Sequence, residues 1–173
     1  FELSTKEYLQ FCDSRVLGRI YYLDDWQSLP FFQTLGPEPL GLKKSEFLKL
    51  FADKKGLIKP LLMDQRFIAG IGNIYAQESL FCAGVHPQRK AQDLTKEELS
   101  RIYDCLIKIL NQSIQQGGSS VDTYRHPDGE QGKHLLFLKV YGNAGNPCLG
   151  CGDPLQSKVV GGRGTVFCPR CQK

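Results

Sequence analysis

Four cysteines near the end of the sequence have the spacing of a metal site. Two residues separate Cys148 from Cys151 and Cys168 from Cys171, and sixteen residues lie between the two pairs. Two tight turns that each present two sulfurs complete the tetrahedron that zinc prefers, and this spacing is typical of a four-thiolate site. Since four thiolates leave no coordination position open, we expect one structural Zn²⁺ held by these four residues.

The residues between the cysteine pairs have the pattern of a hairpin. Residues 158–160 and 164–167 flank a glycine-rich turn, and Arg163 follows the two glycines of that turn. An arginine at the tip of a metal-held hairpin is well placed to bind a phosphate or to enter a nucleic-acid groove. A solubilising role is the alternative for an exposed turn arginine.

A second segment favours an anion. In residues 70–73 two glycines precede Asn73, which is suited to an N-cap, and we expect a helix over residues 74–83. Glycines let the backbone approach another molecule closely, and the N–H groups at the start of a helix attract negative charge. A plain turn between helices is the alternative explanation of these four residues.

Other basic residues are ambiguous when each is taken alone. Lys59 precedes a proline and Arg15 follows an expected turn between strands, so each is either a phosphate contact or part of a solvated surface. The net charge is only +4, but residues 133–173 hold six basic side chains against one acidic one. This concentration favours a polyanionic partner, with an ordinary lysine-bearing surface as the alternative.

The elements that position these residues predict an α+β chain. Polar and apolar residues alternate in residues 1–23 as they do in strands. Because two or three strands cannot cover their own apolar face, we expect the other strands of this sheet to lie upstream, which makes the chain a fragment. Residues 24–42 hold three prolines and are the expected linker. The longest expected helix starts at a capping box, Thr95 with Glu98, and ends at the glycine pair 117–118.

The remaining cysteines bear on the compartment. Cys12, Cys82 and Cys105 lie in apolar stretches and are expected to be buried, unpaired thiols. Seven cysteines cannot all pair within one chain, no secretory leader opens the sequence, and no apolar run approaches the ~20 residues of a membrane span. We therefore expect a reducing, cytoplasmic location and no membrane association.

Residues 70–81 and 84–87, which read GIGNIYAQESLF and GVHP, resemble the helix-two-turn-helix signature of the formamidopyrimidine-DNA glycosylase/endonuclease VIII family. Further stretches agree in the same order: LGPEPL at 35–40, IKP at 58–60, QGG at 116–118, VYG at 140–142 and Arg163 five residues before Cys168. The resemblance implies the domains as follows: the last strands of a β-sandwich in 1–23, a linker in 24–42, a helix-two-turn-helix domain in 43–134 and a zinc finger in 135–173. It also implies that the loop 119–133 closes over the lesion.

The function that the resemblance implies is base-excision repair. Such an enzyme removes oxidised purines, 8-oxoguanine and formamidopyrimidines, from duplex DNA and then cleaves the strand at the abasic site. The implied protein is a monomer associated with a bacterial nucleoid, and its partner is DNA with oxidised bases or abasic sites. The family's nucleophile is an N-terminal proline, helped by a glutamate and a hairpin lysine. None of these three matches a position in this sequence, so we expect the chain to bind DNA without catalysing the reaction.

The resemblance also assigns DNA contacts position by position. Lys59, Asn73 and Arg163 match residues that hold the phosphates around the flipped nucleotide, and Tyr141 is a further candidate for that role. Arg15 matches the residue that fills the gap in the duplex. The next two residues, a valine and a leucine, depart from the family's arginine and aromatic wedge, so stacking there becomes apolar filling.

Two other functions fit part of the pattern. Helix-two-turn-helix elements also occur in a ribosomal protein and a topoisomerase subunit, and four-cysteine ribbons occur in many RNA-binding proteins. A non-catalytic zinc-ribbon module that binds nucleic acid is therefore the alternative. A zinc ribbon that docks an acidic protein is the third hypothesis, which predicts weak DNA affinity without preference for abasic sites.

Overall fold

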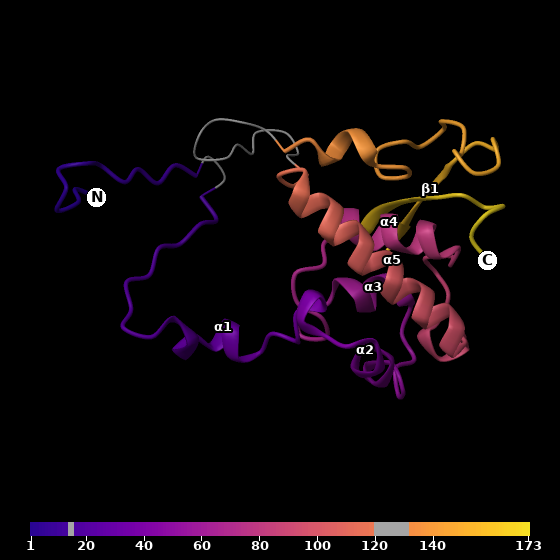
Figure 1. Cartoon of the computed structure of the whole chain (residues 1–173), viewed down its shortest axis with the longest axis horizontal. Helices are drawn as coiled ribbons and strands as arrows, with labels where there is room; N and C mark the ends of the chain where they lie inside the picture. Colours follow the sequence, from indigo (N-terminus) through magenta and orange to yellow (C-terminus); the bar gives the residue numbers. More distant parts are fainter. Residues whose placement is uncertain (14–15, 120–131) are drawn as a thin grey trace. The chain divides into compact units, whose positions relative to one another are not determined.

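A computed structural model of the chain describes residues 1–13, 16–119 and 132–173 (Figure 1). They form two compact units, residues 1–33 and residues 34–173. The boundary falls inside the expected linker, and the second half of that linker packs with the larger unit. The Gly36 amide donates to the carbonyl of Gln65 at 2.8 Å, and the Ala69 amide donates to the carbonyl of Pro37 at 3.1 Å. The larger unit contains two hydrophobic cores.

The smaller unit has little regular structure. It contains a 3-10 turn, η1 (Trp26–Ser28), the short helix α1 (Pro30–Gln33) and one isolated antiparallel bridge between Glu2 and Tyr8. Among its described residues no strand longer than this bridge forms. Their apolar side chains are largely exposed, and a strand without a neighbour leaves its backbone groups unpaired.

The larger unit is helical up to residue 115. Its α-helices are α2 (Lys44–Leu50), α3 (Ile58–Met63), α4 (Asn73–Ala83) and α5 (Lys96–Gln115). The 3-10 turn η2 (Pro39–Gly41) precedes α2, and η3 (Ala91–Asp93) lies between α4 and α5. The predicted capping box is confirmed, because the Thr95 hydroxyl accepts from the Glu98 amide at 3.2 Å and the Glu98 carboxylate accepts from the Thr95 amide at 2.8 Å. No helix of the described residues is both long enough and apolar enough to cross a membrane.

The first core lies between these helices. The buried residues of α5 recur every three to four positions, so one face of the helix packs on α4 and α2. Helix α4 is different, because it is buried on more than one side: Leu80 packs in the first core, whereas Phe81 packs against the second. The members of the second core are Val140, Cys148, Leu155, Val166 and Cys168.

A two-stranded hairpin closes the chain and confirms the α+β class. Strand β1 (Gln156–Val160) pairs antiparallel with β2 (Arg163–Phe167), and Val160 faces Arg163 across the turn. Gly161 and Gly162 have φ values of 59° and 73°, as a two-residue turn with left-handed backbone requires. The turn η4 (His134–Phe137) lies between α5 and the hairpin in sequence.

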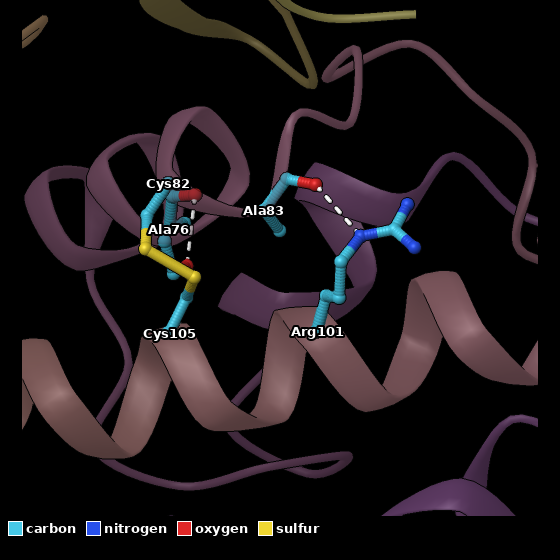
Figure 2. The surroundings of a disulfide bond; sticks show 6 residues. Ala76, Cys82, Ala83, Arg101 and Cys105 are labelled. Atoms are coloured by element: carbon cyan, nitrogen blue, oxygen red, sulfur yellow. Dashed lines mark hydrogen bonds between the residues drawn. A yellow bond between two sulfur atoms is a disulfide. The ribbon is translucent and has the colours of Figure 1, made fainter.

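The prediction that Cys12, Cys82 and Cys105 are buried, unpaired thiols is wrong. Cys82 of α4 and Cys105 of α5 form a disulfide with Cα atoms 5.8 Å apart, and Cys12 is exposed (Figure 2). The same pair of helices is also joined where Nε of Arg101 donates to the carbonyl of Ala83, at 3.3 Å. Apolar neighbours in the sequence did not reveal that the two cysteines face each other across a helix pair.

Reduction of this disulfide should lower the free energy of unfolding by about 3 kcal/mol, because it releases a loop of 23 residues in the unfolded chain. Urea unfolding with and without a phosphine reductant measures the difference, and peptide mapping without reductant should recover the linked pair. Cys12→Ser is the control and should change neither result. Alkylation of both Cys82 and Cys105 in the native, unreduced protein would contradict the pairing.

Candidate functional site

The four C-terminal cysteines come together as a zinc site. Their sulfur atoms all lie within 4.8 Å of one another, with 3.8 Å between Cys148 and Cys171 and 3.5 Å between Cys151 and Cys168. A tetrahedron with Zn–S bonds of ~2.3 Å has edges of about 3.8 Å. Backbone amides also point at two of the sulfurs, at 3.4 Å on Cys148 and 3.3 Å on Cys168, as expected around thiolates. The donor set fits one Zn²⁺ with no open position.

Three of the predicted DNA contacts form one cluster, although they come from three elements. Nζ of Lys59 in α3 donates to Oδ1 of Asn73 at the start of α4, at 2.7 Å. Nδ2 of Asn73 donates to the carbonyl oxygen of Gly164, at 3.2 Å. Because Gly164 directly follows Arg163, these two bonds connect α3 and α4 to the beginning of β2. We call Lys59, Asn73 and Arg163 the anion cluster.

The side chain of Asn73 bonds within the anion cluster and does not cap α4. Helix α4 begins at Asn73 itself, and the N-cap position is Gly72, which makes no side-chain capping bond. The prediction of Asn73 as the N-cap was wrong by one residue. Its amide is free to join Lys59 to the hairpin because a glycine occupies the cap.

The electrostatics of the anion cluster are unbalanced. The side chain of Lys59 is fully buried, and this burial, together with the nearby charge of Arg163, lowers the pKa of Lys59 to about 8. Neither Lys59 nor Arg163 is in any of the ion pairs found among the described residues. Two cations held close together without a carboxylate favour a bound anion, and a phosphate offers several oxygens to both.

The hairpin turn sits against α3. A Cβ atom on Gly161 would lie 2.7 Å from Cγ of Pro60, and the φ of Gly161 is 59°. Glycine is therefore required twice at this position, once for the backbone conformation and once for the close approach. The contact places the tip of the hairpin next to Lys59.

Of the other two predicted contacts, Tyr141 lies among the described residues. Tyr141 is half-buried, and its backbone amide donates to the carboxylate of Glu78 in α4 at 2.9 Å. Arg15 lies outside the described residues, as do residues 120–131 of the expected lesion-capping loop. Both assignments stay predictions.

Two buried residues of α4 were missed by the sequence reasoning. Glu78 accepts from the amides of Lys139, Val140 and Tyr141, each at 2.9 Å, and Gln77 bonds to β2. Both lie inside a helix that is covered on several sides, so they cannot be recognised from an amphipathic pattern. The available signal was a run of three polar residues, 77–79, between apolar ones in a helix that was expected to pack.

Two family models match the chain. The first, described as the formamidopyrimidine-DNA glycosylase H2TH domain, matches residues 35–125, and the second, described as a zinc finger found in FPG and IleRS, matches residues 145–173. Fold and site thus define a helix-two-turn-helix protein with a C-terminal zinc finger, and the predicted structural zinc is confirmed. The chain belongs to the formamidopyrimidine-DNA glycosylase family.

Similar proteins come from bacteria. The formamidopyrimidine-DNA glycosylase of Desulfitobacterium hafniense is 43% identical over 175 residues, which cover 99% of this chain and 64% of that protein. The one from Nitratidesulfovibrio vulgaris is 43% identical over 176 residues, which cover 100% of this chain and 48% of that protein. The chain thus spans about half to two thirds of the length of these curated relatives.

Solved structures agree with the sequence matches. The crystal structure of the MutM (Fpg) protein from Thermus thermophilus matches this chain with a TM-score of 0.80 and 43% sequence identity. The matched residues cover 86% of this chain and 57% of the Thermus chain. Lactococcus lactis Fpg in a complex with DNA containing an abasic site matches with a TM-score of 0.77 and 39% sequence identity. The matched residues cover 85% of this chain and 55% of the Lactococcus chain.

Metal analysis should return one zinc per chain. Chelation should unfold residues 140–173 and leave α5 folded, because zinc binding contributes on the order of 10–16 kcal/mol to such a small unit while the first core contains no metal ligand. Amide spectra recorded before and after chelator follow both parts. Two metals per chain, or hairpin signals unchanged by complete removal of zinc, would be inconsistent with the site.

Proposed function

We propose that this chain binds duplex DNA at a damaged or abasic nucleotide through the anion cluster, and that it is the DNA-binding part of a bifunctional glycosylase/AP lyase for oxidised purines. The observation that carries the proposal is the buried ammonium of Lys59 held beside Arg163, with neither residue in an ion pair among the described residues. Extrusion of a base costs a few kcal/mol, and a clamp on the kinked backbone from two sides offsets that cost. The abasic-site complex of the Lactococcus lactis relative supports the choice of DNA.

We propose that the covalent chemistry depends on residues outside this stretch of 173. The family's proline nucleophile, its glutamate and its hairpin lysine have no counterpart in the sequence, whereas all residues of the anion cluster are present. In the same proposal residues 1–23 end a catalytic β-sandwich, Tyr141 and Arg15 add DNA contacts, and the protein acts as a monomer at the chromosome of a bacterium.

Replacement of Arg163 by alanine tests the role of the anion cluster. Affinity for a duplex with an abasic-site analogue is measured over a series of salt concentrations. Arg163→Ala should weaken binding and reduce the salt slope by ~0.9, the contribution of one phosphate contact. Arg170→Ala is the matched control, because Arg170 is an exposed arginine of the same zinc finger that pairs with Asp153 at 3.5 Å. An equal slope for the wild type and Arg163→Ala would refute the assignment.

The same preparation separates binding from catalysis. With borohydride and an 8-oxoguanine duplex the chain should give no covalent adduct, since no iminium forms without the proline amine. A trapped adduct would show that a nucleophile is present among these residues. Equal affinity for intact and abasic duplexes would instead favour the non-catalytic nucleic-acid-binding module.

DNA binding should also weaken as pH rises above about 8, the pKa of Lys59 in the free chain. Below this pH the ammonium of Lys59 is charged in both free and bound states, whereas above it the neutral amine of Lys59 must take up a proton when the phosphate binds. The DNA affinity should therefore fall by at most about tenfold for each pH unit above the pKa. Lys59→Met should bind more weakly and without this decline. An identical pH profile for both proteins would remove Lys59 from the site.

A further inference from the structure

Gln77 is a buried amide with every polar group in use. It is 2% exposed in the middle of α4. Its Nε2 donates to the carbonyl of Asn73 and to the carbonyl of Gly164, each at 3.1 Å, and its Oε1 accepts from the amide of Val166 at 2.7 Å. Both N–H donors and the acceptor oxygen of this amide are therefore engaged, by one residue of its own helix and two of the hairpin.

The bonds to Gly164 and Val166 lie along one edge of β2. Because Val160 and Arg163 close the turn, Gly164 and Val166 face non-hydrogen-bonded positions of β1, and their backbone groups point away from it. Gln77 pairs with this free edge as a neighbouring strand would. A slip of the hairpin along α4 by one residue would bring Thr165 opposite Gln77. The backbone groups of Thr165 point toward β1, so the amide of Gln77 would lose its partners, and Arg163 would move by about 3.4 Å.

We propose that Gln77 is a positioning residue that sets the register of the zinc hairpin on α4 and so places Arg163 beside Lys59 and Asn73. The inference rests on the proposed function of the anion cluster. The carbonyl of Gly164 is the shared point, since it accepts from both Asn73 and Gln77. Gln77 itself lies beneath the cluster and acts on DNA only through Arg163 and Asn73.

Other contacts keep the zinc finger attached when Gln77 changes. Glu78 holds residues 139–141, and the side chain of Gln172 links the carbonyl of Val85 at 2.9 Å to the amide of Cys168 at 2.8 Å. The turn also packs on Pro60. A variant at position 77 should therefore fold and bind zinc. It should change the register of the hairpin on α4 without detaching the zinc finger.

Gln77→Met keeps the length and volume of the side chain and removes all three bonds. It should weaken binding to the abasic-site duplex by about tenfold, the worth of one charge-assisted contact, and lower the salt slope by about one unit, as Arg163→Ala does. In the double variant Gln77→Met/Arg163→Ala the losses should not multiply, because both remove the same contact. Gln112→Met, at an exposed glutamine of α5, is the matched control and should bind as the wild type does.

A second variant separates positioning from general destabilisation. Gln77→Glu keeps an acceptor for the Val166 amide but turns a negative charge toward two carbonyl oxygens. Relative to wild type its DNA affinity should fall at neutral pH and recover as the pH is lowered and the carboxyl regains a proton. A loss that is the same at every pH, with reduced zinc content, would show a merely structural role and overturn the proposal, and so would multiplicative losses in the double variant.

The proposal and the DNA-binding function fail in different ways. Hydrogen exchange of the Val166 amide, measured without DNA, should be slow in the wild type and fast in Gln77→Met. If it is slow in both, Gln77 does not hold the hairpin, whatever binds the cluster. If exchange behaves as expected but Arg163→Ala leaves the salt slope unchanged, the register role stands and the assignment of the cluster to phosphate falls.

Discussion

The docking of the zinc hairpin on α4 is the contact on which the site depends. Lys59 and Asn73 belong to the helical part, whereas Arg163 belongs to the hairpin, so the anion cluster exists only while the two are held together. The carbonyl of Gly164 makes the link by accepting from Asn73 at 3.2 Å and from Gln77 at 3.1 Å. Figure 1 shows the hairpin, in yellow, beside α4, and β2 contacts that helix. The zinc closes the hairpin, and the helix fixes where its tip lies.

The burial of Lys59 is the physical basis of the anion binding that we propose for the cluster. A lysine this deeply buried is uncommon unless it is paired, and its pKa of about 8 reflects the cost of keeping the charge away from water. The amide oxygen of Asn73, which accepts from Nζ of Lys59, is neutral and does not neutralise the charge. A phosphate would supply the missing charge, which is the physical reason for connecting an electrostatic imbalance in the free chain with nucleic acid.

Much of this arrangement was predictable from local patterns. The cysteine spacing identified the zinc ligands, and the capping box and apolar period located α5, because these features depend on neighbours in sequence. The contacts that cross between elements were not predictable. Neither the pairing of Cys82 with Cys105 nor the roles of Gln77 and Glu78 left a periodic signal, since each depends on which helix faces which. Local patterns marked Lys59, Asn73 and Arg163 separately and the family resemblance gave them a shared role, but the bonds that join their elements are seen only in the fold.

The most direct test of the central claim is a crystal structure of the chain bound to a duplex with an abasic-site analogue. The account predicts phosphate oxygens of the backbone at the analogue within about 3 Å of Nζ of Lys59, Nδ2 of Asn73 and the guanidinium of Arg163, with Gln77 still bonded to Gly164. DNA bound to another face, or a hairpin displaced from α4 in the complex, would contradict it.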